Sequence, residues 1–272
     1  MLRVSKLHAG LVLAGVLLVG VWVGCVFVDK ESPRSGGSEL RLGALNGELT
    51  NPLLECEIAE DTIGARKEDF TPILNTFVEN LKLSEGVENI SVYYRDLNNG
   101  PIVGINQGDN FAPASLLKVP VLIAYLKWAE DKPGVLDEKI TFTNPVDVGY
   151  VQQFAPSAPL EVGKTYTAKE LLEIMTKYSD NQALVLLFKR IPPQYQEDLY
   201  NLLGVDSKLI TDPTARLTIR QYSIFFRILF NASFLSRTNS EYALDLLSQS
   251  SFEDGLRAGV PFPTVVSHKF GE

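Results

Sequence analysis

A run of twenty residues without a charge, at positions 9–28, sets the strongest limit on how this chain can fold. Twenty residues at helical rise match the hydrocarbon thickness of a bilayer. Arg3 and Lys6 precede the run, and the charges after it are balanced, so the positive-inside bias keeps the N-terminus in the cytoplasm. We expect a membrane anchor over residues 1–30 and a linker over residues 31–65, with the remaining chain extracytoplasmic.

Two other interpretations of the uncharged run stay open. It can be a signal peptide that is cleaved at a small-residue site. Gly24 and Cys25 also offer a lipidation site, although Trp22 stands where such sites usually carry Leu. The mass of the mature N-terminus distinguishes the three, because a lipidated chain begins at Cys25 with an acyl group added.

The composition excludes several other functions. The 272 residues carry 25 basic against 33 acidic side chains, with no Lys/Arg-rich stripe, which argues against a nucleic-acid partner. Two cysteines and two histidines are too few for a Cys/His metal site, so we expect no metal and no cofactor. Cys56 lies in a short apolar patch and is expected to be a packed residue. One domain of ordinary size follows the linker, and we expect a monomer.

The hydrophobic pattern predicts an α+β order of elements. Apolar side chains recur at helical spacing in the first element, at Phe70, Ile73, Leu74, Phe77 and Leu81. Two β-rich runs, 91–95 and 102–105, flank Asn99-Gly100, a dipeptide that suits a tight hairpin turn. Thr167 and Glu170 form a capping box that opens a helix to Tyr178. Three more helices and one last strand are expected, at 115–128, 184–188, 217–230 and 264–266.

Ser115 and Lys118 are the most informative residues for chemistry. They stand three apart within an apolar helix and therefore share a face. Burial disfavours the ammonium form of a lysine, which makes Lys118 a candidate base for the Ser115 hydroxyl. The alternative is a lysine that snorkels from the helix rim.

Two later motifs complete the pattern. Ser179-Asp180-Asn181 lies where one helix ends and another begins, and its alternative role is a helix cap. Lys269-Phe270-Gly271 follows the last β-like run. Ser-x-x-Lys, Ser-Asp-Asn and Lys-[Ser/Thr]-Gly, in this order, mark class A β-lactamases and penicillin-binding proteins. Residues 66–272 resemble that family in three stretches, at 111–120, 178–183 and 254–261.

The resemblance implies a fold and a set of roles. The fold is a β-lactamase/transpeptidase-like α+β domain, in which a helical subdomain joins an antiparallel sheet covered by helices. Ser115 would be the nucleophile, with its N–H in the oxyanion hole, Lys118 the base, and Ser179 the proton route to the leaving nitrogen. Asn181, Lys269 and Gly271 would bind the substrate, the first at its amide and the second at its carboxylate.

Three departures from the family pattern follow from the residues. Phe270 stands where the family has a hydroxyl residue. The stretch 205–216, where class A enzymes carry a water-activating Glu, contains none. Asp212 is the one carboxylate that we nominate as a substitute, and its alternative and favoured role is that of a turn or helix-cap residue before Pro213. Two further strands and a closing helix of the family would follow Gly271, so we expect an open sheet in which residues 264–269 are unpaired or mispaired.

These features imply an acylating serine hydrolase. The first interpretation is a β-lactamase that is acylated at Ser115 and hydrolyses β-lactams, with slow turnover because the base is missing. The second is a D-Ala-D-Ala carboxypeptidase or transpeptidase that acts on cell-wall peptides. The third is a non-catalytic relic of the same fold. A Ser115→Ala variant separates an enzyme from a binder.

Overall fold

The computed structural model describes residues 49–51, 70–97, 102–146, 154–210, 212 and 214–271, all within the compact unit Arg41–Glu272. The expected anchor, Cys25 and Cys56, and the turn at Asn99-Gly100 lie outside these residues. In the described part, no helix has both the length and the apolarity that a bilayer crossing needs.

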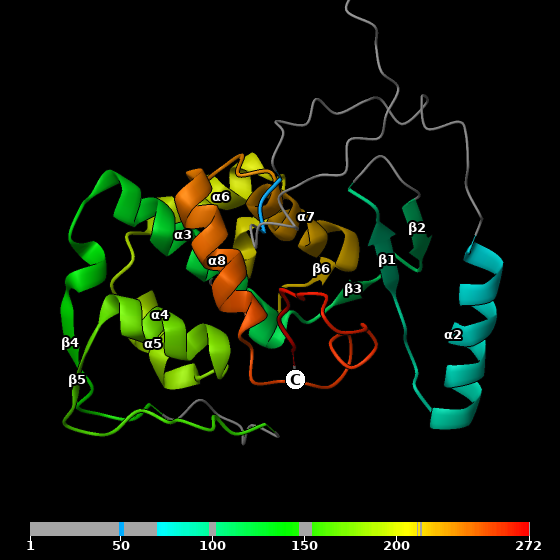
Figure 1. The fold of residues 1–272 in the computed structure, drawn as a ribbon, viewed down its shortest axis with the longest axis horizontal. Coiled ribbons are helices and arrows are strands. Elements are labelled where there is room, and N and C mark those ends of the chain that lie inside the picture. Colours follow the sequence, from blue (N-terminus) through cyan, green and yellow to red (C-terminus); the bar gives the residue numbers. More distant parts are fainter. Residues whose placement is uncertain are drawn as a thin grey trace, which may run out of the picture. The chain divides into compact units, whose positions relative to one another are not determined.

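The elements follow an α+β order (Figure 1). The α-helices are α2 (Thr71–Glu85), α3 (Lys118–Asp131), α4 (Ala168–Lys177), α5 (Asn181–Phe188), α6 (Pro193–Leu202), α7 (Ile219–Phe230) and α8 (Arg237–Ser248). The short 3₁₀ helices are η3 (Ala114–Leu117), η4 (Val135–Asp137) and η5 (Ser207–Ile210). The strands are β1 (Val92–Arg95), β2 (Ile102–Ile105), β3 (Asn110–Phe111), β4 (Lys139–Thr141), β5 (Thr165–Thr167) and β6 (Leu217–Thr218).

Helix α3 forms the centre of the core. Helices α4, α6 and α8 all contact it (Figure 1). Ten of the fourteen residues of α3 are buried, and Leu122, Ile123, Tyr125 and Leu126 are completely buried. A helix that is apolar on all sides belongs in a protein interior. The element that follows Ser115 is therefore held rigidly by its neighbours.

Helix α4 begins at the predicted capping box. The Thr167 hydroxyl accepts a hydrogen bond from the Glu170 N–H at 3.1 Å, and the Glu170 carboxylate accepts one from the Thr167 N–H at 2.7 Å. Two backbone donors that the first helical turn leaves unpaired are thereby satisfied. The helix ends at Tyr178, immediately before the second motif.

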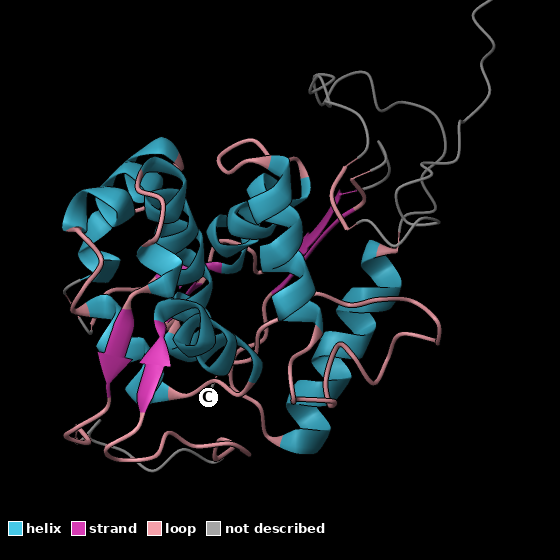
Figure 2. Ribbon diagram, turned by 60° about the vertical axis from the view of Figure 1, so that its left-hand side comes forward, coloured by secondary structure: helices cyan, strands magenta, loops and turns pink. Residues whose placement is uncertain are grey.

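The strands form three separate antiparallel pairs among the described residues: β1–β2, β3–β6 and β4–β5. The two β-rich runs pair as predicted, with Val92 opposite Ile105 and Arg95 opposite Ile102. The expected last strand at 264–266 is wrong, because residues 261–269 form no strand, and Figure 2 draws this end as loop. Without a neighbouring strand to hydrogen-bond, a β-rich run has no ladder to join. This segment bonds to α8 instead, where the His268 N–H donates to the Leu247 carbonyl at 3.3 Å and the Ser267 hydroxyl to the Leu244 carbonyl at 2.7 Å.

Helix α2 forms where the apolar periodicity predicts it, but its apolar face is not buried. Ile73 is 71% exposed and Phe77 57% exposed, and Val78 is the buried residue of the helix. Strand β2 is the element that α2 contacts most. A helical pattern of apolar residues indicates which face of a helix can be buried, but burial also needs a neighbouring element that packs against that face.

Candidate active site

Ser115 lies in a tight turn at the N-terminal end of α3. The expected helix from Ser115 onward begins as the 3₁₀ turn η3, and the α-helix starts at Lys118. Residues i and i+3 eclipse one another in a 3₁₀ helix. This brings Lys118 Nζ to 2.6 Å from Ser115 Oγ, with both residues buried, at 4% and 1% exposure for the serine and the lysine.

The backbone is strained at two points of this site. Ala114, directly before Ser115, has φ +45°, and Ser179 has φ +57°, both in the left-handed region. Such a conformation costs a non-glycine residue about 1–3 kcal/mol and persists only where the surroundings enforce it. The strain lies next to the two hydroxyls that face each other, with Ser179 Oγ donating to Ser115 Oγ at 3.1 Å.

The second motif, Ser179-Asp180-Asn181, caps α5 and also contacts Lys118. Asp180 caps α5 by accepting a hydrogen bond from the Ala183 N–H at 2.7 Å, and burial raises the pKa of its carboxyl. Ser179 and Asn181 flank this cap, and both contact Lys118. The cap interpretation therefore holds for Asp180, while its neighbours project into the site.

Lys118 Nζ lies within hydrogen-bond distance of four oxygens. Besides Ser115 Oγ, they are the Ser179 carbonyl at 2.9 Å, Ser179 Oγ at 3.1 Å and Asn181 Oδ1 at 2.7 Å. Lys118 is therefore not a lysine that snorkels to solvent. Its nitrogen sits at the meeting point of the first and second motifs.

The third motif closes the site from the C-terminal end of the chain. The buried Lys269 donates from Nζ to Ser179 Oγ at 2.9 Å and to the Phe270 carbonyl at 2.9 Å. Gly271 lies against the η3 turn that carries Ser115, where a Cβ on it would come within 3.2 Å of Leu116 Cγ. The structure thus brings together Ser115, Lys118, Ser179, Asn181 and Lys269, with Gly271 beside them.

A cluster of three phenylalanines on the Lys269 side was not expected from the sequence. Phe270 stacks on Phe252 with ring centroids 4.5 Å apart, and Phe154 meets both rings edge-on at 5.1 and 5.8 Å. The Phe270 ring also faces Lys269, whose Nζ lies 3.8 Å from the ring centroid. Of the three rings, only Phe270 lies within a sequence motif. Phe154 and Phe252 come from distant segments, so the sequence showed no sign of the cluster.

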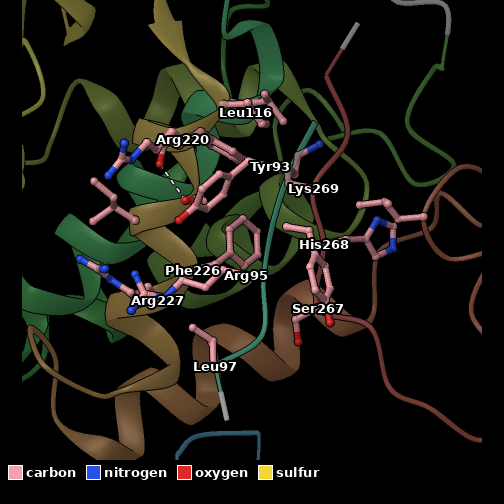
Figure 3. A pocket seen from close by; sticks show the side chains of 16 residues that line it. Tyr93, Arg95, Leu97, Leu116, Arg220, Phe226, Arg227, Ser267, His268 and Lys269 are labelled. Atoms are coloured by element: carbon pink, nitrogen blue, oxygen red, sulfur yellow. Dashed lines mark hydrogen bonds between the residues drawn. The ribbon is translucent and has the colours of Figure 1, made fainter. Parts of the chain in front are cut away.

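Lys269 also lines a cavity of about 500 Å³. Strand β1, helix α7 and residues 267–269 line it, and Figure 3 shows Arg95, Arg220 and Arg227 on one side with His268 and Lys269 on the other. Burial, aided by the charge of Lys269, lowers the pKa of His268. Lys269 therefore borders both this cavity and the site around Ser115.

The proposed substitute for the missing Glu is a turn residue. Asp212 Oδ1 accepts hydrogen bonds from the N–H and the hydroxyl of Thr214, at 2.8 and 2.6 Å. These contacts lower the pKa of its exposed carboxyl, which weakens it as a base. The structure gives Asp212 the role of holding its own loop.

Comparisons with known proteins place the fold. Residues 73–272 match the Beta-lactamase enzyme family. A class A beta-lactamase from Mycobacterium abscessus shares 24% identity and a TM-score of 0.58, over 69% of this chain and 75% of its own. A beta-lactamase from Burkholderia phymatum shares 19% identity and a TM-score of 0.60, over 73% of this chain and 78% of its own.

A PBP-A variant solved as an acyl-enzyme with penicillin G shares 20% identity and a TM-score of 0.58, over 74% of this chain and 78% of its own. A search of curated proteins found no match. Because these identities are below 25%, the similar structures support the fold alone. The family match covers residues 73–272, which is most of the chain. The chain belongs to the beta-lactamase enzyme family.

Proposed function

We propose that this protein is a serine hydrolase of the class A β-lactamase type, acylated at Ser115 by β-lactams and slow to hydrolyse them. One observation carries the proposal: the buried amine of Lys118 lies 2.6 Å from Ser115 Oγ. A nucleophile needs a base within hydrogen-bond reach, and this contact supplies one.

The partners of Lys118 orient its proton-accepting lone pair. The Ser179 carbonyl and Asn181 Oδ1 can only accept, so they take two N–H groups of the amine. In the neutral amine the remaining direction carries the lone pair, and it faces the hydroxyls of Ser115 and Ser179. Lys118 can then take the Ser115 proton as Oγ attacks the lactam carbonyl carbon.

Ser179 provides the route for that proton to the leaving group. Its hydroxyl bridges Ser115 and the two lysines, at 3.1 Å from Ser115 Oγ, 3.1 Å from Lys118 Nζ and 2.9 Å from Lys269 Nζ. As the lactam C–N bond breaks, Ser179 gives its proton to the nitrogen and regains one from Lys118. The positive charge of Lys269 favours this transfer by stabilising negative charge on the Ser179 oxygen.

Deacylation is the slow step in this account. Hydrolysis of the acyl-enzyme needs a base to activate water, and residues 205–216 offer only the carboxylates of Asp206 and Asp212. Both accept hydrogen bonds within their own loop, Asp206 from the Lys208 N–H at 2.9 Å and Asp212 from Thr214. The acyl-enzyme is therefore expected to persist.

Labelling with a fluorescent penicillin tests the proposal. The wild-type chain should become covalently labelled, and the Ser115→Ala variant should not. A Ser84→Ala variant, at an exposed serine of α2, serves as the matched control and should label normally. A variant without Ser115 that keeps full ligand affinity and a wild type that never labels would instead identify a binding protein, a relic of the fold.

A D-Ala-D-Ala carboxypeptidase or transpeptidase is the second candidate. It would use the same acylation by Ser115, and the lack of a Glu in residues 205–216 favours it. The uncharged run at 9–28 supports an uncleaved membrane anchor that holds the domain outside the cytoplasm, where cell-wall peptides lie. Release of D-alanine from a peptide ending in D-Ala-D-Ala would identify this activity.

A further inference from the structure

The aromatic cluster defined by Phe154, Phe252 and Phe270 shapes the Lys269 side of the site. Its rings come from three segments: the stretch between β4 and β5, the stretch after α8, and the C-terminal end. Their centroids lie 4.5 to 5.8 Å apart, in stacked and edge-on contacts. Phe154 keeps 45% of its surface exposed, so the cluster offers an apolar face to solvent.

The Lys269 ammonium is already engaged within this cluster. Lys269 Nζ donates one hydrogen bond to Ser179 Oγ and a second to the Phe270 carbonyl, both at 2.9 Å. The Phe270 ring, 3.8 Å from Nζ, faces the same ammonium as a cation–π partner. A carboxylate that approached Lys269 would have to displace one of these three partners.

The position after Lys269 adds a second obstacle to a carboxylate. Phe270 has no hydroxyl to donate, and its ring packs against the rings of Phe252 and Phe154. A carboxylate that loses water next to apolar surface without gaining hydrogen bonds is strongly disfavoured. An aromatic group in the same place gains both apolar burial and favourable ring contacts.

We propose, as a refinement that rests on the function proposed above, that Ser115 accepts neutral acyl donors carrying an apolar or aromatic group on the Lys269 side. Esterified β-lactams and aryl esters belong to this class. A substrate carboxylate adds little to the reaction. The site is thus an esterase-like acylation site in addition to a β-lactam site.

The ester reaction uses the same groups. Ser115 Oγ bonds to the ester carbonyl carbon while its proton moves to Lys118, and the bond from that carbon to the phenol oxygen breaks. Ser179 passes a proton to the departing oxygen and regains one from Lys118, so a neutral phenol leaves. Water then cleaves the acyl-enzyme to a carboxylic acid and restores the Ser115 hydroxyl.

Benzylpenicillin and its methyl ester form a matched pair that differs only at the carboxylate. The rate constant for acylation of Ser115 is measured for both by intact-protein mass spectrometry. In the wild type the methyl ester should acylate Ser115 at least as fast as the free acid. In Phe270→Thr the free acid should gain at least about tenfold over the ester, the scale of one restored charge-assisted hydrogen bond.

Phe77→Thr is the control for the substitution itself, because Phe77 is an exposed residue of α2 outside the cluster, at 57% exposure. It should leave the ratio unchanged. Phe252→Leu provides a second variant that keeps an apolar residue, and it should slow acylation by the methyl ester more than by the free acid. Circular dichroism establishes that each variant is folded.

The outcomes separate this inference from the proposed function. A wild type that prefers the free acid by about a hundredfold, with Phe270→Thr no different, overturns the inference and leaves the β-lactamase function standing. Ser115-dependent release of nitrophenol from 4-nitrophenyl phenylacetate, without acylation by either penicillin, overturns the β-lactamase function and the esterified β-lactam part of the inference, and supports its aryl ester part. No acylation of Ser115 by any of the three compounds overturns both.

Discussion

Ser179 Oγ lies within hydrogen-bond distance of two lysines, at 3.1 Å from Lys118 Nζ of the first motif and at 2.9 Å from Lys269 Nζ of the third. Its own proton points at Ser115 Oγ, 3.1 Å away, and one of its lone pairs accepts from Lys269; in the mechanism proposed above, Lys118 donates to the second lone pair once it has taken up the Ser115 proton. The hydrogen bonds of this one hydroxyl therefore join residues of all three motifs.

Replacing Lys118 by Met tests the proposed role of Lys118 as a base separately from its role in packing. The side chain keeps its length, but the base is lost, so the acylation rate constant should fall by at least about a hundredfold. The Ser179 carbonyl and Asn181 Oδ1 lose their donor, at a cost of about 1–3 kcal/mol in the free energy of unfolding. Stopped-flow labelling and urea denaturation measure the two effects. Acylation at the wild-type rate would mean that another group takes the Ser115 proton.

Asp212→Asn tests whether the Asp212 carboxylate activates water for deacylation. Because the Asp212 side chain is committed to Thr214, the lifetime of the acyl-enzyme should change by less than about threefold, well under the effect of a general base. The decay of the adduct is followed by mass spectrometry. A lifetime lengthened more than about tenfold would assign the water-activating role to Asp212 after all.

Stability should depend on pH through His268. Burial and the neighbouring charge of Lys269 lower the pKa of this imidazole in the folded chain, so the unfolded chain binds a proton that the folded chain does not. The free energy of unfolding should therefore fall as the pH drops below ~6.5, the ordinary histidine range. His268→Gln should lose this part of the dependence when urea midpoints are compared at pH 7 and pH 5. An identical slope in the variant would place the dependence in another group.

Thr167→Ala should weaken the start of α4. The substitution removes the hydroxyl that caps the Glu170 N–H, and loss of such a cap costs about 0.5–2 kcal/mol. Thr167→Ser keeps the hydroxyl and should restore most of the loss. Chemical denaturation of the three chains measures the difference, and equal midpoints for Ala and Ser would show that the capping box contributes little here.

Local signals in the sequence predicted local structure well. The capping box at Thr167 and the pairing of 92–95 with 102–105 depend on neighbours in the chain, and both are present. The exposed face of α2 and the missing strand at 264–266 depend on distant partners, which a hydrophobic pattern does not identify.

The site shows the same division. The motif spacing indicated which residues to examine, and the structure brings Ser115, Lys118, Ser179, Asn181 and Lys269 within one hydrogen-bonded group. The cluster around Phe270 could not be foreseen, because stacking on Phe252 and contact with Phe154 join segments that are far apart in sequence.

The most direct test of the central claim is an intact-mass time course of the wild-type chain with benzylpenicillin, followed by tandem mass spectrometry to locate the adduct. Our account predicts one penicilloyl group on Ser115 that forms quickly and decays slowly, and none in Ser115→Ala. Hydrolysis of the penicillin by wild type and Ser115→Ala alike, with no adduct on Ser115 at any time, would contradict it.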